Sequence, residues 1–109
     1  MPRRHYLASA GQRYTRLRVE FEWDPEKDRS NQEKHGVAFV EASTAFDDPL
    51  SRTVRDPRHS EGEFRFVTIG YSSSNRLIVV AHADRGERVR IITARVAEPK
   101  ERRKYESEA

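Results

Sequence analysis

The sequence predicts a two-layer α+β domain in which an antiparallel sheet meander is covered by helices. Three segments with apolar residues at strand spacing, 64–71, 76–83 and 87–95, follow one another with only short turns between them. Strands joined by short turns pair antiparallel. Helix signals precede these strands at 24–36 and follow them at 98–106. The predicted element order is β-α-α-β-β-β-β-α, with the helices gathered on one face of the sheet.

The predicted domain begins with a strand at residues 17–23. These residues alternate strictly, so four apolar side chains fall on its buried side: Leu17, Val19, Phe21 and Trp23. Residues 1–17 show neither helical nor alternating periodicity, and we interpret them as a disordered or dispensable extension. Residues 18–109 then form a single domain with one modest core.

The segment after this strand carries the signals of an unusually polar helix. Asp24 can accept a backbone N–H as N-cap, Pro25 suits the first turn, and Gly36 suits the left-handed residue that ends a helix. No aliphatic residue occurs between Glu26 and His35. The face that this helix turns toward the rest of the fold must therefore be polar as well.

The remaining elements follow from shorter signals. Residues 37–46 predict a second short helix, which Asp47-Asp48-Pro49 ends. A strand is expected over 51–55, and a polar loop over 56–63 leads into the meander. The last predicted element is a charged helix with Pro99 in its first turn.

Composition excludes several classes of site. The chain has no cysteine, which rules out disulfides, thiolate metal sites and cysteine nucleophiles and favours the cytoplasm. The longest apolar stretch, Leu77–Ala81, is too short to cross a bilayer. The four histidines lack metal-ligand spacing, and no phosphate-cradling glycine loop is present. We therefore expect no metal, no cofactor and no membrane association.

The net charge of +3 conceals an uneven distribution along the chain. Residues 1–18 carry five arginines and no acid, residues 19–63 carry a net −6, and residues 64–109 carry a net +4. A basic half suits a polyanion such as RNA, and an acidic half suits a basic partner protein. The alternative is that both halves are solvated surfaces, and charge alone favours that alternative.

Several histidine, lysine and arginine side chains could act on RNA. Cleavage without a metal needs a base for the 2′-hydroxyl, cations on the scissile phosphate and an acid for the leaving oxygen. Histidine carries protons near neutral pH, and arginine binds phosphate through two parallel N–H groups. The candidates with these properties are Lys34, His35, Arg65, His82, Arg88, Arg90 and Arg95.

The two candidate histidines each have a structural alternative. His35 could simply interact with the end of its helix. His82 alternates with Ile78 and Val80, so a hydrogen-bonded core histidine is at least as good an interpretation.

The candidate arginines share predicted strand faces with apolar residues. Arg65 alternates with Val67 and Ile69, and the same spacing places Arg95 on one side of its strand with Ile91. A charged side chain on such a face must be paired or must reach solvent. Together with His82 these arginines predict a sheet face that becomes polar at one end. The alternative is a structural ion-pair cluster with an acidic residue, Glu63 or Asp84.

With these residues laid out, the chain resembles the BrnT toxins of type II toxin–antitoxin systems. The resemblance spans roughly residues 18–106. It lies in Phe21-Glu22-Trp23-Asp24-Pro25, Lys27, Asn31, Lys34-His35-Gly36-Val37, Phe39-x-Glu41-Ala42, Phe46-Asp47-Asp48-Pro49, Glu63-x-Arg65-x3-Ile69-Gly70, Val80-x-His82, Arg85, Arg90-Ile91-Ile92-Thr93-Ala94-Arg95 and Glu101-Arg102-x2-Tyr105-Glu106. The pattern from Trp23 to Gly36 is the most specific part.

The resemblance implies a RelE-like ribonuclease fold and a toxin that inhibits translation by cutting RNA. It also implies neutralisation by a BrnA-type antitoxin with a ribbon-helix-helix DNA-binding part, through which the complex binds operator DNA. Oligomers are expected only through the antitoxin. The active-site members carried over are Lys34, His35, Arg65, His82 and Arg95. The residues expected to contact RNA are Arg85, Arg88, Arg90, Arg102 and Tyr105.

Chemical roles within this set are our own inference from the residue types. Proton transfer falls to His82 or His35, and phosphate binding falls to Arg65 and Arg95. An alternative function is a non-catalytic interaction module that binds a DNA-binding partner through the acidic half of the chain. That alternative predicts tight complex formation without RNA cleavage by the free protein.

Overall fold

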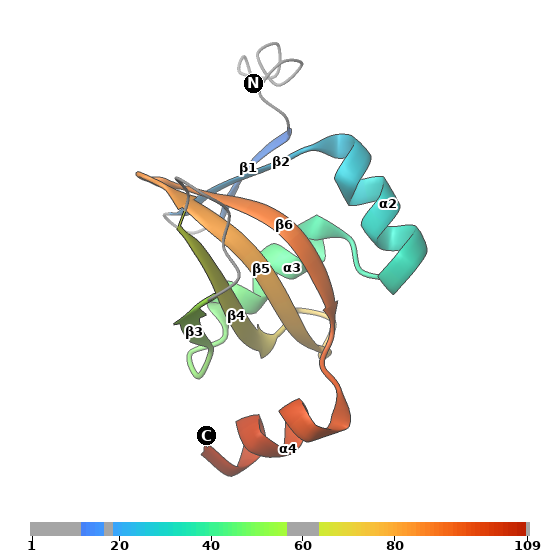
Figure 1. Ribbon diagram of the computed structural model, residues 1–109, viewed down its shortest axis with the longest axis vertical. Helices are drawn as coiled ribbons and strands as arrows, with labels where there is room; N and C mark the ends of the chain where they lie inside the picture. The colour runs from blue at the N-terminus through green and yellow to red at the C-terminus, as the bar shows by residue number, and fades with distance from the viewer. Residues whose placement is uncertain (1–11, 17–18, 57–63, 109) are drawn as a thin grey trace.

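The computed structural model describes residues 12–16, 19–56 and 64–108 (Figure 1). Within these ranges, six strands form one sheet in the order β1-β2-β6-β5-β4-β3. The strands are β1 (Gln12–Arg16), β2 (Val19–Trp23), β3 (Arg52–Arg55), β4 (Arg65–Tyr71), β5 (Leu77–Arg85) and β6 (Arg88–Val96). The helices are α2 (Pro25–His35), α3 (Phe39–Thr44), the 3-10 turn η2 (Ala45–Asp47) and α4 (Pro99–Glu108). The predicted α+β class is confirmed.

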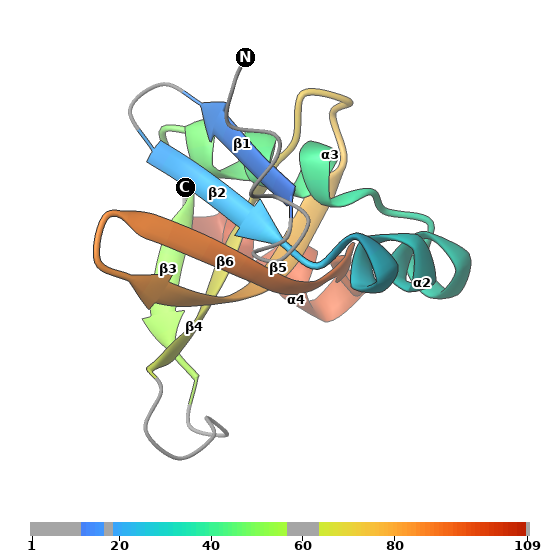
Figure 2. The same ribbon diagram turned by 90° about the horizontal axis from the view of Figure 1, so that it is seen from above.

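The meander from β4 to β6 pairs antiparallel throughout, as predicted, and β3 extends it by pairing antiparallel with β4. The sheet also contains one parallel pair, because β2 lies beside β6 with Glu20, Phe21 and Glu22 opposite Arg88, Val89 and Arg90. This parallel pair joins the N-terminal hairpin to the meander (Figure 2). It was not predicted, since a pairing between strands so far apart in sequence leaves no local signal.

Strand β1 corrects the prediction for the N-terminal extension. Gln12–Arg16 pairs antiparallel with β2, with Gln12 opposite Trp23 and Arg16 opposite Val19. The prediction of disorder is therefore wrong for these five residues. Residues 1–11 and 17 lie outside the described residues, and the dispensability of the extension stays a prediction.

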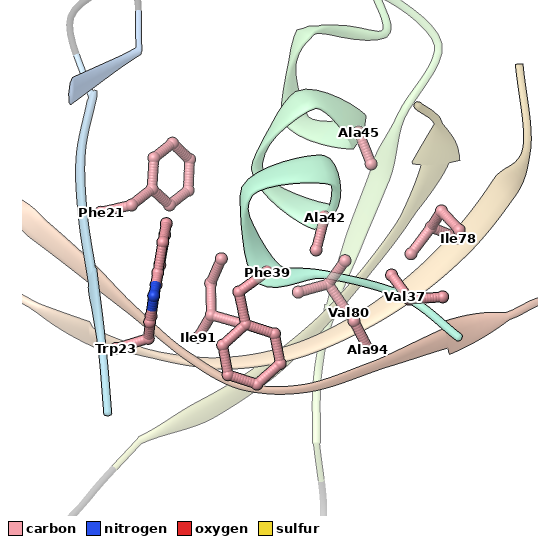
Figure 3. Close-up of a cluster of buried hydrophobic side chains, with 10 residues drawn as sticks. All are labelled: Phe21, Trp23, Val37, Phe39, Ala42, Ala45, Ile78, Val80, Ile91 and Ala94. Carbon is pink, nitrogen blue, oxygen red and sulfur yellow. The ribbon is translucent and has the colours of Figure 1, made fainter. Parts of the chain in front are cut away.

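The main core lies between one face of the sheet and the helices α3 and η2 (Figure 3). In the close-up, α3 places Phe39 and Ala42 among side chains from three strands. The buried members of this core are Phe21, Trp23, Val37, Phe39, Ala42, Ala45, Ile78, Val80, Ile91 and Ala94. We call this side of the sheet the inner face, and the opposite side the outer face.

Helix α4 packs on the outer face, which corrects the prediction that all helices share one face. Its Tyr105 clusters with Leu77 and Val79, which alternate along β5 with the inner-face residues Ile78 and Val80. Tyr105 is the one residue of α4 that is buried. The C-terminal helix therefore covers one end of the outer face, beyond the end of β6 in Figure 1.

The polar helix α2 has the predicted caps. The Asp24 carboxylate accepts from the Glu26 N–H at 2.9 Å, and Gly36 adopts φ 70° at the C-terminal end. The helix lies beside β6 (Figure 1) and buries a single residue, Asn31. The Asn31 amide bonds to the backbone of Ala94 and of Val37. Packing through a polar side chain explains how a helix without aliphatic residues attaches to the fold.

Candidate functional site

Arginines from three strands stand side by side on the outer face. Arg65 of β4 lies opposite Ala83 of β5, and Ala83 lies opposite Arg90 of β6. Arg90 in turn lies opposite Glu22 of β2. Residues paired across strands share a face of the sheet. This row therefore brings two arginines together over a fully buried alanine whose side chain is short.

The Glu22 carboxylate is the centre of this group. Its side chain is only 4% exposed, and three guanidinium groups surround it. Arg90 Nη1 lies 3.4 Å from Oε2, Arg88 Nε lies 3.5 Å from Oε1, and Arg85 Nη1 lies 3.8 Å from Oε2. We call these four residues together with Arg65 the arginine cluster.

The arginines around Glu22 combine a buried anchor with exposed guanidinium groups. One carboxylate faces three guanidinium groups, and the side chains of Arg85, Arg88 and Arg90 remain 49%, 37% and 26% exposed. The buried Glu22 carboxylate holds these three arginines in place while their side chains still reach the surface. Because arginine donates two parallel N–H groups, such a cluster is suited to a phosphate or another oxyanion.

Sequence reasoning selected the arginines but missed Glu22 as a site residue. Strand alternation places Glu22 on the side opposite Phe21, where a solvent-exposed acid is the usual expectation. The arginines of the β5–β6 hairpin cover that side and bury the carboxylate. Three arginines within six residues, from Arg85 to Arg90, were the available signal that a counter-charge is needed.

His82 lies on the inner face, away from the arginine cluster. Its ring stacks on Phe66 with centroids 5.9 Å apart, and the edge contact with Phe46 is 5.0 Å between centroids. Nε2 is 2.8 Å from Thr68 Oγ1, and Nδ1 is 3.2 Å from Asp84 Oδ1. The prediction that His82 shares a sheet face with the arginines is wrong, because it projects from the other side of β5.

Burial lowers the pKa of His82 below its usual 6.5, although the nearby Asp84 carboxylate acts in the opposite direction. Both ring nitrogens have partners, and Thr68 is itself 2.7 Å from Thr53 Oγ1. A hydrogen-bonded chain thus crosses β3, β4 and β5. These contacts fit the alternative considered for His82, a satisfied core histidine.

Arg95 stands on the outer face, but it is engaged by α4. Its Nη1 and Nη2 donate to the two carboxylate oxygens of Glu101, both at 2.8 Å. That hydrogen-bonded contact is the main cause that raises the pKa of Arg95. The expected alternation with Ile91 fails, because the β5–β6 register shifts between Ala81 and His82. Arg95 therefore faces the side opposite Ile91 and anchors the start of α4.

The two α4 residues expected to contact RNA have structural partners. Tyr105 is buried, and its hydroxyl donates to Asp48 Oδ2 at 2.5 Å. The Tyr105 hydroxyl is thus engaged within the fold, and the RNA contact of this residue stays a prediction. Arg102 remains 42% exposed, and its Nη1 donates to the Tyr71 hydroxyl at 3.3 Å.

Lys34 and His35 lie exposed in the last turn of α2. Across the part of the chain that the structure describes, no hydrogen bond or ion pair of their side chains joins them to the arginine cluster. The structure thus brings together Arg65, Arg85, Arg88 and Arg90 from the predicted set, and it leaves His35, His82 and Arg95 in separate surroundings.

Two further features of the described residues bear on the class of protein. Within residues 12–16, 19–56 and 64–108, no group of three or more histidine, aspartate or glutamate side chains could hold a metal ion. None of the helices in those ranges is both long enough and apolar enough to span a bilayer.

Comparison with known proteins decides the family. Residues 23–101 match the family model described as the ribonuclease toxin BrnT of type II toxin–antitoxin systems. The chain belongs to the BrnT family. Membership makes RNA the class of substrate and an antitoxin the partner of this BrnT-family protein. The match includes every arginine of the cluster and begins one residue after Glu22.

A solved structure supports the fold of this family member. The crystal structure of the Brucella abortus ribonuclease toxin BrnT is similar with a TM-score of 0.51. The two chains are 23% identical, and the match covers 70% of this chain and 92% of the other. A search of curated protein sequences finds no match.

Proposed function

We propose that this BrnT-family protein cleaves RNA on its outer face and that the arginine cluster binds the scissile phosphate. The observation that carries the proposal is the buried Glu22 carboxylate with three guanidinium groups around it. A preorganised group of cations stabilises charge that develops on a phosphate without reorganising during the reaction. Arg65 supplies a further cation from the neighbouring strand of the same row.

In the proposed reaction a ribose 2′-oxygen forms a bond to the adjacent phosphorus, and the bond from phosphorus to the 5′-oxygen breaks, which leaves a 2′,3′-cyclic phosphate. The 2′-hydroxyl proton passes to water, and water returns a proton to the departing 5′-oxygen. Arginines that bind the non-bridging oxygens lower the barrier by offsetting their increasing negative charge. The reaction is proposed to need no metal. His82 receives no part in proton transfer, because both of its ring nitrogens are bonded on the inner face. Lys34 and His35 stay predicted members of the site.

The partner is proposed to be a BrnA-type antitoxin with a ribbon-helix-helix part that carries the complex to operator DNA. The proposal follows from membership in a toxin–antitoxin family together with the acidic residues 19–63, which suit a basic partner. We further propose that the protein acts in the cytoplasm and forms oligomers only through this antitoxin.

Expression in bacterial cells without an antitoxin tests the proposed activity. The wild-type chain is expected to stop growth and translation, and Arg65→Ala or Arg90→Ala is expected to relieve the arrest. Arg29→Ala is the matched control, because Arg29 lies on α2 in an exposed pair with Glu26. Wild-type expression without effect on growth or on RNA integrity contradicts the proposal. Tight antitoxin binding without any RNA cleavage supports the alternative of a non-catalytic interaction module.

A further inference from the structure

A groove on the outer face is lined by residues of α4 and of the sheet. Its volume is about 520 Å³, and Tyr105 of α4 forms part of its wall. The floor is apolar and comes from three neighbouring strands: Val54, Val67, Ile69 and Val79. A volume of this size falls within the range of roughly 300–1,000 Å³ that small-molecule sites occupy.

The groove lies on the same face of the sheet as the arginine cluster, and β4 contributes a residue to each. Val67 on the groove floor lies two residues from Arg65 on β4, a separation of about 7 Å along a strand. The β5 residues opposite these two positions are Ala81 and Ala83, whose short side chains raise no barrier between them. A ligand could therefore occupy the groove and the cluster at the same time.

Charged side chains in the lining of the groove supply both donors and acceptors. Arg52 forms an ion pair with Glu108, and both residues line the groove. Lys104 and Glu101 also line it from α4. An apolar floor with charged side chains in the lining suits a flat ring system that has polar atoms on its rim, and the nearby arginines suit an attached phosphate.

We propose that this groove binds one unstacked base of an RNA strand whose neighbouring phosphate lies on the arginine cluster. Proteins that recognise single-stranded RNA commonly hold bases splayed out of the stack in this manner. The groove then sets the base preference of the enzyme next to the cleaved bond. This inference rests on the proposed function, since it takes RNA as the ligand.

Binding of short oligonucleotides tests the groove directly. The probes are 2′-O-methyl trinucleotides, which cannot be cleaved through the 2′-hydroxyl, with the base removed at one position at a time. For the wild-type protein, loss of the base at one position is expected to weaken binding about 10-fold, the size of one base-stacking contact. Loss of the base at the other positions is expected to have a much smaller effect.

Two valine-to-aspartate variants test whether the contact with the base lies in the groove. Val54→Asp alters the groove floor at a side chain that is 61% exposed, so the fold should tolerate it. Val40→Asp is the matched control, because Val40 is 42% exposed on α3 and does not line the groove. The position-specific 10-fold effect is expected to disappear in Val54→Asp and to persist in Val40→Asp.

The outcomes distinguish failure of the base-binding proposal from failure of the proposed ribonuclease function. The proposal that the groove binds one base is overturned if base removal has equal effects at every position. It is also overturned if the position-specific effect is unchanged in Val54→Asp. If Arg65→Ala and Arg90→Ala still weaken binding in that case, the proposed function stands. Loss of antitoxin binding alone in Val54→Asp overturns the base site and assigns the groove to the partner protein. Absence of binding by every probe overturns both proposals.

Discussion

The side-chain amide of Asn31 satisfies both backbone groups of Ala94. Asn31 Nδ2 donates to the Ala94 carbonyl at 2.8 Å, and the Ala94 N–H donates to Asn31 Oδ1 at 3.1 Å. The register of the β2–β6 pair covers only Arg88 to Arg90 of β6, so Ala94 has no partner in β2. A helix side chain therefore takes the place of a missing strand, and the one buried side chain of α2 makes polar contacts.

Asn31→Ala is expected to lower the free energy of unfolding by about 2–4 kcal/mol. The variant leaves the buried N–H and C=O of Ala94 without partners, and each unsatisfied group is costly. Urea denaturation measures the change. Gln32→Ala, on the exposed side of the same helix, serves as the control and should change stability by less than about 0.5 kcal/mol. Equal stability of the two variants contradicts this account of α2.

Glu22→Gln tests whether the buried carboxylate positions the arginines. The variant removes a negative charge, so RNA binding at low salt is expected to stay equal or become tighter. The turnover rate is expected to fall about 10-fold or more, because the guanidinium groups lose their fixed arrangement. Glu33→Gln on α2 is the control. A wild-type turnover rate for folded Glu22→Gln removes Glu22 from the site.

Tyr105→Phe tests how α4 is attached. The Tyr105 hydroxyl donates to a carboxylate, Asp48, that also accepts the N–H groups of Tyr71 and Leu50. Loss of this charge-assisted bond is expected to lower the free energy of unfolding by about 1.5–3 kcal/mol. Tyr71→Phe removes an exposed bond to Glu106 and should cost less than about 1 kcal/mol. The reverse order in thermal or urea unfolding contradicts the assigned roles.

His82 predicts a pH dependence of stability. Burial lowers its pKa in the folded state below the ordinary 6.5, so the unfolded chain binds a proton first as the pH falls. Stability should therefore be constant above about pH 7 and decrease below pH 6.5, before carboxylates begin to titrate. His82→Gln is expected to flatten this part of the curve, and His35→Gln is expected to preserve it. An unchanged slope in His82→Gln contradicts the assignment.

The order of elements could be predicted because it rests on local signals. Alternation and turn residues located the meander, and Asp24 with Gly36 located both ends of α2. The parallel pairing of β2 with β6 could not be predicted, because strand pairing over this distance depends on the complete chain. The side on which α4 packs depends on the hydrogen bond from Tyr105 to Asp48, which is 57 positions away in sequence.

The candidate site was predicted in part for the same reason. Arg65 was correctly placed on a face with Val67 and Ile69, since β4 is regular. Arg95 was misplaced relative to Ile91, because the register shift in the β5–β6 pair is not encoded by periodicity. His82 lies on the inner face with Ile78 and Val80, as its alternation with them indicated. The error was the prediction that His82 and the arginines share one face of the sheet.

Cleavage of single-stranded RNA by the purified free protein, in the presence of a metal chelator, tests the central claim most directly. The wild-type protein and Arg29→Ala are expected to cleave at equal rates. Arg65→Ala and Arg90→Ala are each expected to be slower by about 100-fold, the effect of removing one preorganised donor, while circular dichroism shows an unchanged fold. Wild-type rates for both folded cluster variants, or no cleavage by the wild-type protein, contradict the claim that the arginine cluster is the centre of a ribonuclease site.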